Sequence, residues 1–118
     1  MGVLQWVVQP LSVFTITGVS FSGVYDVMDA QEVHGLFTGS YIAAGSLAVE
    51  MQTSIDGINW SSLGSAFTTY TTSNTAAMAY QVVSVTSAIY RYVRFRYNLT
   101  TGPVTFGTQL FVKTTSSV

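Results

Sequence analysis

The chain has 118 residues and a formal net charge of −1 at pH 7, and only 8% of its residues are charged, against about 25% in an average soluble domain. This length fits one domain that can bury a core of its own. The near-neutral charge argues against a nucleic-acid partner, which requires a basic surface. The lack of cysteine excludes disulfides, thiolate metal sites and cysteine nucleophiles.

The low charge also bears on the surface of the molecule. Hydrophobic residues make up 48% of the chain, whereas a soluble monomer normally keeps its surface charged and free of apolar patches. We therefore expect copies or partners to cover much of the surface; the alternative is a monomer coated with Ser and Thr. Gln5, Gln9 and Pro10 interrupt the apolar N-terminal run, and no basic residue precedes it. This pattern favours neither a signal peptide nor a membrane-spanning helix, so no membrane partner is expected.

The first half of the chain contains short β-rich runs between Gly, Ser and Asp clusters, a pattern typical of sandwiches and barrels. Pro10 marks the end of a strand or a bulge, and Gly35 indicates a bulge or a close backbone approach. The expected strands are residues 3–8, 12–17, 24–27 and 32–38. A loop with an apolar tip is predicted over residues 39–45.

Residues 46–60 are the clearest single element. Leu47, Val49 and Met51 alternate with polar or small residues, as in a half-buried strand. Asp56-Gly57 predicts a tight type I′ turn, in which both central residues have positive φ. Trp60 then returns toward the fold as a predicted core anchor.

The second half repeats the strand pattern. The expected strands are residues 67–70, 78–85, 90–97 and 104–112, followed by a tail over 114–118. No helical periodicity and no internal repeat are present. The sequence therefore predicts a single domain over residues 1–118, an all-β, antiparallel β-sandwich of about eight strands that is jelly-roll-like. Its N-terminal segment, residues 1–17, is a candidate assembly arm.

Residues that carry chemistry are few. His34 is the only histidine, and no Ser lies in a G-x-S-x-G elbow. Asp26, Asp29, Glu32 and His34 form the one cluster of potential metal ligands, but no calcium-loop spacing surrounds them, and turn-shaping is the simpler role for the two Asp residues. We predict no catalytic, cofactor-binding or metal-binding residues, no cofactor and no enzymatic activity.

Arginines alternate with tyrosines near the C-terminus. Val93, Phe95 and Tyr97 fit the core face of one strand, and Arg94 and Arg96 fit its outer face. Two outward arginines are too few for a nucleic-acid platform. They are expected to meet Glu50 across the sheet or a carboxylate on a neighbouring chain.

The candidate interface residues are aromatic, apolar or arginine, the types that dominate contact sites. They are Tyr41, Ile42, Tyr70, Tyr92, Arg94, Arg96 and Trp6.

Three segments resemble a known group of proteins. They are SGVYDVMDAQEVHGLF (Ser22 to Phe37), VEMQTSIDGINW (Val49 to Trp60) and YRYVRFRYNLTTGPVTFGTQLFVK (Tyr90 to Lys113). Together they resemble small β-sandwich virion proteins of tailed bacteriophages, in which S-x-D-G-x-x-W is followed by an R-Y-V-R strand and a closing V-T-F strand. The same pieces are similar to discoidin-like, galactose-binding jelly rolls, although this chain is shorter and lacks their ligand loops.

The phage resemblance implies a non-enzymatic virion structural protein, with a capsid decoration or cement protein as the leading form. Its partners would be the major capsid protein and copies of itself, for example in a trimer. It would be made in the cytoplasm of the host bacterium and reside on the capsid surface. The resemblance leaves two alternatives open, a carbohydrate-binding jelly-roll module and a tail or connector component of the virion.

Overall fold

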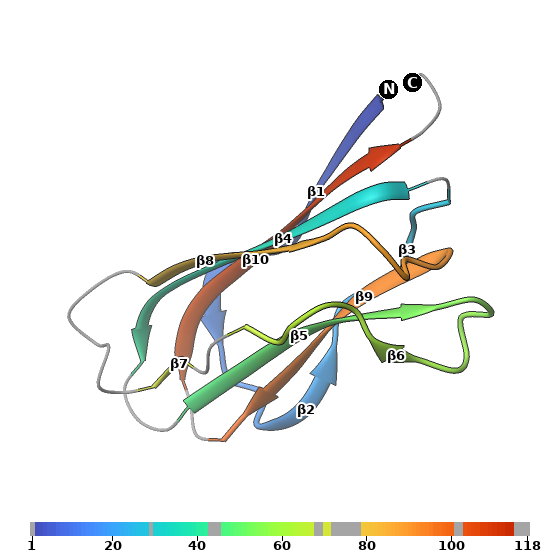
Figure 1. The fold of residues 1–118 in the computed structure, drawn as a ribbon. Helices are drawn as coiled ribbons and strands as arrows, with labels where there is room; N and C mark the ends of the chain where they lie inside the picture. Colours follow the sequence, from blue (N-terminus) through green and yellow to red (C-terminus); the bar gives the residue numbers. More distant parts are fainter. Residues whose placement is uncertain are drawn as a thin grey trace.

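The chain folds into two antiparallel β-sheets that pack face to face (Figure 1). The structure is a computed structural model that describes residues 2–28, 30–42, 46–67, 70–71, 79–100 and 103–114, with the backbone alone at residues 2, 40–42, 70–71 and 79. The strands are β1 (Gly2–Phe14), β2 (Gly18–Phe21), β3 (Tyr25–Asp26), β4 (Ala30–Ile42), β5 (Ser46–Ser54), β6 (Ser61–Ser62), β7 (Tyr70–Thr71), β8 (Ala79–Val85), β9 (Tyr92–Leu99) and β10 (Val104–Thr114). Within these ranges no helix is long and apolar enough to cross a membrane.

The strand order defines the fold. The four-stranded sheet has the order β1-β10-β4-β8, and the six-stranded sheet has the order β2-β9-β5-β6, with β3 beside β9 and β7 beside β5. When the short strands β3 and β7 are set aside, the first strand pairs with the last, the second with the seventh, the third with the sixth and the fourth with the fifth. This nested pairing is that of a jelly roll. The predicted fold class, an antiparallel jelly-roll-like sandwich, is confirmed.

The N-terminal strand is longer than predicted. The two expected strands at 3–8 and 12–17 are one bent strand, β1, which pairs with β10 along both halves. Its register shifts between Val7 and Gln9 and again before Ser12, so that the kink lies at Pro10, which has no N–H to donate. Gly107 of β10 permits the bend, because a Cβ atom there would lie 3.0 Å from the Gln9 carbonyl oxygen. Residues 2–14 of the candidate assembly arm are thus part of the domain's own sheet.

Strand β4 is also longer than predicted, because it continues through Tyr41 to Ile42. The expected loop at 39–45 is therefore wrong over its first four residues, whose backbone is strand. Gly35 has the close approach expected of it: a Cβ atom there would meet Met51 Sδ at 2.6 Å and the ring of Phe67 at 3.2 Å. A glycine at this point lets the two sheets come together.

The core lies between the sheets and is built by period-2 alternation. In β5, Leu47, Val49 and Met51 are buried while the residues between them are half-exposed, as predicted. The largest fully buried side chains come from both sheets: Phe95, Phe106, Leu47, Met51, Leu63, Leu99 and Leu110. Tyr97 of β9 and Thr108 of β10 share a buried hydrogen bond of 2.8 Å across the core. Burial raises the pKa of Tyr97, so its hydroxyl stays protonated.

Candidate interaction surfaces

The outer side of the four-stranded sheet carries apolar side chains among polar ones. Val7, Leu36 and Val82 lie in one cross-strand row with Gln109, and Phe111 lies in the next row. We call the outer-side residues Val3, Val7, Leu36, Tyr80, Val82 and Phe111 the apolar face. Four of them are strongly exposed: Val3 at 62%, Val7 at 57%, Tyr80 at 70% and Val82 at 45%. The inner side of the same strands holds buried residues such as Phe106 and Leu110, so apolar side chains lie on both sides of this sheet.

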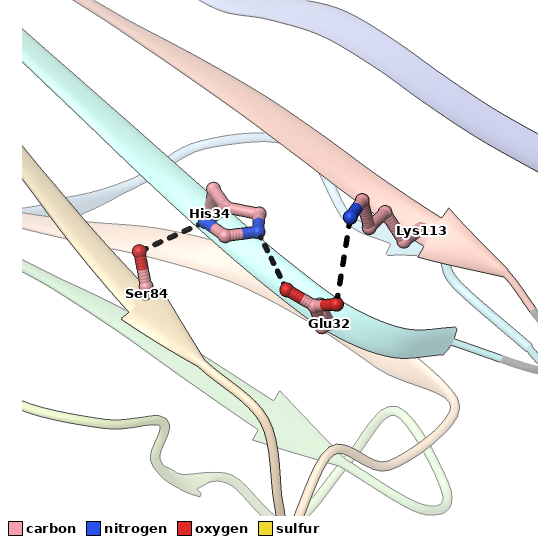
Figure 2. A network of polar contacts seen from close by, with 4 residues as sticks. All are labelled: Glu32, His34, Ser84 and Lys113. Atoms are coloured by element: carbon pink, nitrogen blue, oxygen red, sulfur yellow. Dashed lines mark hydrogen bonds and ion pairs between the residues drawn. The ribbon is translucent and has the colours of Figure 1, made fainter.

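A chain of polar contacts crosses the same outer side (Figure 2). Ser84 Oγ lies 2.8 Å from His34 Nδ1, and His34 Nε2 lies 3.2 Å from Glu32 Oε1. Lys113 Nζ lies 3.6 Å from the other oxygen of Glu32. The polar groups therefore satisfy one another within the sheet, and the charge of Glu32 is balanced by its neighbour.

The polar chain contains the residue types of a catalytic triad: a possible nucleophile, Ser84, a possible base, His34, and a possible orienting acid, Glu32. The sequence did not predict this grouping. The arrangement differs from a working relay, because Ser84 contacts Nδ1 and the carboxylate contacts Nε2, the reverse of the usual attachment. The side chains also lie on an open sheet side, with His34 30% and Glu32 32% exposed. Water reaches them freely, which weakens the electrostatic stabilisation on which such catalysis depends.

The outer side of the six-stranded sheet is different in character. The guanidinium of Arg94 lies between two aromatic rings, 3.9 Å from the ring centre of Phe21 and 4.2 Å from that of Trp60. Its Nε donates a hydrogen bond of 2.8 Å to Gln52 Oε1. Partial burial lowers the pKa of Arg94, although not enough to discharge an arginine. We call Phe21, Gln52, Trp60 and Arg94 the arginine clamp.

Arg94 differs from the other cations of the chain. Arg91 pairs with Asp26 at 3.1 Å, Arg96 with Glu50 at 3.9 Å, and Lys113 with Glu32. The hydrogen bond from Arg91, aided by the Met28 N–H, lowers the pKa of Asp26. Over the ranges that the structure describes, Arg94 is the one arginine or lysine without an ion pair.

The loop that carries Trp60 is held by Asp56. The Asp56 carboxylate accepts hydrogen bonds from the N–H groups of Ile58 and Asn59, from the Asn59 amide and from the Ser54 hydroxyl, all at 2.8 to 3.0 Å. Gly57 has a φ of +78°, but Asp56 does not have a positive φ. The predicted type I′ turn is therefore wrong: six residues separate β5 from β6, and the aspartate side chain supplies the loop's hydrogen bonds.

The Asp56 hydrogen bonds also lower its pKa far below the ordinary range, with the backbone bonds as the main cause. The loop directs Trp60 onto the outer side of the sheet, where it is half-buried. The prediction of Trp60 as a core anchor is wrong. Beside its ring lies a pocket of about 280 Å³, whose lining includes Ile55, Asn59 and Tyr90.

The other predicted interface residues lie in several parts of the fold, and their role as contact residues stays a prediction. Trp6 points inward and packs against Tyr25 with ring centres 5.2 Å apart, and Tyr92 lies under the Arg91 guanidinium at 5.2 Å. The predicted contact of Arg96 with Glu50 is present. The side chains of Tyr41, Ile42 and Tyr70 lie outside the described residues.

The metal-ligand candidates are not brought together where the structure describes them. Asp26 accepts the Met28 N–H at 3.1 Å, an Asx turn as predicted, and pairs with Arg91. Glu32 and His34 lie together on the four-stranded sheet, and Asp29 is outside the described residues. In the described part of the chain no three His, Cys, Asp or Glu side chains form a metal-binding group.

Comparisons with known proteins show the fold. No protein-family model matches the chain, and no curated protein matches it in sequence. Among solved structures, the PBSX exported protein XepA superposes with a TM-score of 0.65 at 15% identity, over 98% of this chain and 38% of that protein. The SPBc2 prophage-derived protein YomS superposes at 0.59 and 14% identity, over 95% and 94% of the two chains. A chain of infectious bursal disease virus, strain Gx, superposes at 0.61 and 9% identity, over 94% of this chain and 32% of that one.

These three structures share the β-sandwich with this chain at identities too low to show more than the fold. The chain spans about two fifths of XepA and about a third of the virus protein, but nearly all of YomS. The predicted resemblance to small β-sandwich proteins of bacteriophages is confirmed at the level of the fold.

Proposed function

We propose that this chain is a non-enzymatic structural protein of a bacteriophage virion that decorates the capsid in many copies. In this proposal it docks on the major capsid protein and on copies of itself, and it resides on the capsid surface. The observation that carries the proposal is the apolar face, a solvent-facing sheet side with Val3, Val7, Tyr80 and Val82 exposed.

The apolar face is suited to docking. Exposed apolar side chains that gather on one side of a sheet favour a contact there, because covering them removes apolar area from water. The polar residues that cross this face already satisfy one another through the contacts of Ser84, His34, Glu32 and Lys113. A partner therefore covers the face without leaving a buried charge unpaired, which would be costly.

Decoration requires only modest affinity for each copy. A shell presents many equivalent sites, and linked copies that bind several sites gain avidity without stronger individual contacts. A face of this kind on a small sandwich is compatible with such an interface. The open setting of Ser84 and His34, described above, supports a non-enzymatic role.

The structural likenesses support the proposal without deciding it. YomS, which this chain matches over nearly its full length, is prophage-derived, and the third likeness is to a virus. These origins belong to those proteins. They favour a virion or phage role over the alternative of a carbohydrate-binding module.

The test is to quantify the chain in purified particles and to measure how a recombinant chain binds shells that lack it. We expect a fixed, high copy number on heads and saturable binding to the empty shells. Val7→Lys places a charge on the apolar face and is expected to abolish binding, while Ser65→Lys, on an exposed loop before β7, is the matched control. Absence from heads, or presence only in tails, would overturn the decoration role.

A further inference from the structure

We propose that the arginine clamp is a docking site for an acidic segment of a second, different protein, whose carboxylate binds the free end of the Arg94 guanidinium. The inference rests on the proposed structural role, since it supplies that role with a second contact surface. This surface lies on the opposite side of the sandwich from the apolar face.

The clamp holds Arg94 in one orientation. Phe21 and Trp60 cover the two faces of the guanidinium, and Gln52 accepts the Nε hydrogen. The two terminal nitrogens of Arg94 make no hydrogen bond with a described residue, and Arg94 is partly exposed. Two parallel N–H groups held at the end of a rigid fork match a carboxylate in bidentate geometry.

The carboxylate has to come from another kind of molecule. Glu50, the acid on the neighbouring strand, is paired with Arg96 and accepts the Gln52 amide at 3.3 Å. Asp56 uses both its oxygens in the loop that carries Trp60. Asp26 and Glu32 are paired with Arg91 and Lys113. A second copy of this chain thus offers no spare carboxylate among the acids that the structure describes.

The surroundings of the clamp favour a protein over an acidic glycan. Ile55 and Ile58, on the same loop as Trp60, are 70% and 79% exposed, and bare aliphatic side chains match an apolar side chain better than a sugar hydroxyl. Trp60 and Tyr90 border the neighbouring pocket. Trp, Tyr and Arg are the residues enriched at the energetic centres of protein interfaces.

The experiment uses defined acidic polymers as probes for the full chain. Trp6→Phe leaves Trp60 as the single tryptophan, so its fluorescence reports on the clamp, and the Arg94 Nε–H resonance reports on the guanidinium. Poly-L-glutamate and a random glutamate–leucine copolymer are titrated, with polygalacturonate as the acidic glycan and poly-L-glutamine as the uncharged polymer.

We expect saturable changes in both signals with the two acidic polypeptides, tighter for the copolymer because of its apolar side chains, and weaker as salt rises. Arg94→Gln is expected to weaken binding by about tenfold or more, as loss of a charged hydrogen-bond pair does. Arg94→Lys keeps the charge but loses the fork, and its binding is expected to be intermediate. Lys113→Gln, which removes one positive charge on the opposite side of the sandwich, is the matched control and is expected to bind as the parent does.

Several outcomes would overturn the inference. One is no signal change with either acidic polypeptide; another is equal loss of binding in the Arg94→Gln and Lys113→Gln variants. Binding of polygalacturonate without binding of the polypeptides would assign the clamp to an acidic glycan. If the unmodified chain binds shells while Arg94→Gln retains polyglutamate binding, the clamp assignment fails and the proposed function stands.

Discussion

The two outer sides of this sandwich share one core but differ in whether their charged side chains form ion pairs. On the four-stranded sheet, Glu32 forms an ion pair with Lys113 and a hydrogen bond with His34. On the six-stranded sheet, Arg94 is enclosed by aromatic rings and has no carboxylate partner among the described residues. The difference shows that a chain with very few charges can still make two distinct surfaces, one whose charged side chains pair with one another and one whose arginine lacks such a pair.

The largest expected effects come from the core that both sides share. Phe95 lies on the inner side of the six-stranded sheet and Phe106 on that of the four-stranded sheet, and both are fully buried. Replacing either with Ala should lower the free energy of unfolding by about 3–5 kcal/mol through lost burial and a cavity. Guanidinium denaturation measures this. Equal losses of unfolding free energy in the two variants would show that both sheets depend on the core alike and differ only on their outer sides. A loss below about 1 kcal/mol in either variant would contradict a core that both sheets share.

The next effect concerns the hydrogen bond that joins the two sheets inside the core. Tyr97→Phe leaves the buried Thr108 hydroxyl without its hydrogen-bond partner, and we expect it to lower the free energy of unfolding by about 1–3 kcal/mol. The double variant Tyr97→Phe/Thr108→Val removes both polar groups and should regain much of that stability. A double variant less stable than the single variant would contradict this.

The same residue predicts a pH dependence. Burial raises the pKa of folded Tyr97 above its ordinary value of 10.0, so above that pH the unfolded chain releases a proton that the folded chain keeps. The unfolded state then binds fewer protons, and stability falls as pH rises. The parent is expected to lose stability above pH 10 more steeply than Tyr97→Phe, as chemical denaturation at stepped pH would show. Parallel profiles would argue against a buried, protonated Tyr97.

A smaller effect is expected at the loop that carries Trp60, where Asp56→Ala removes four hydrogen bonds. The pKa of Asp56 is lowered in the folded state, so its contribution is present above the ordinary value of 3.8 and is lost as pH falls below it. The difference in denaturation midpoint between the parent and Asp56→Ala should therefore narrow below that pH.

In the same Asp56→Ala variant, polyglutamate binding at the clamp should weaken while shell binding by the apolar face persists. Loss of both would indicate general unfolding.

The smallest effect is expected on the four-stranded sheet. Lys113→Gln breaks an exposed ion pair with Glu32, and such pairs contribute about 0–1 kcal/mol, less at high salt. Thermal denaturation at low and high salt measures it. A loss above about 2 kcal/mol would contradict the account of this pair as a surface interaction.

Much of the architecture could be predicted because alternation decides which side of a strand is buried. Val93, Phe95 and Tyr97 face the core as expected, and the outward pairing of Arg96 with Glu50 followed from the same period. The bend at Pro10 could not be predicted uniquely, because a proline indicates either a bulge or the end of a strand. The turn at Asp56 was misread because side-chain hydrogen bonds replaced the backbone geometry that Asp-Gly usually indicates.

The candidate surfaces were less predictable than the fold. Tyr80 and Val82 lie on one side of a predicted strand, but only the strand order shows that this side faces outward. Ser84, His34 and Lys113 meet across three strands that are far apart in sequence. The arginine clamp likewise needs Phe21, Trp60 and Arg94 from three separate segments. No local pattern contains such contacts.

The most direct test is co-sedimentation of the recombinant chain with empty shells from which it has been removed. The account predicts that the parent chain and Ser65→Lys pellet with the shells up to one fixed copy number and raise the shells' resistance to heat, while Val7→Lys stays in the supernatant with its fold intact. A stable monomer that never pellets, or a Val7→Lys variant that binds as the parent does, would contradict it.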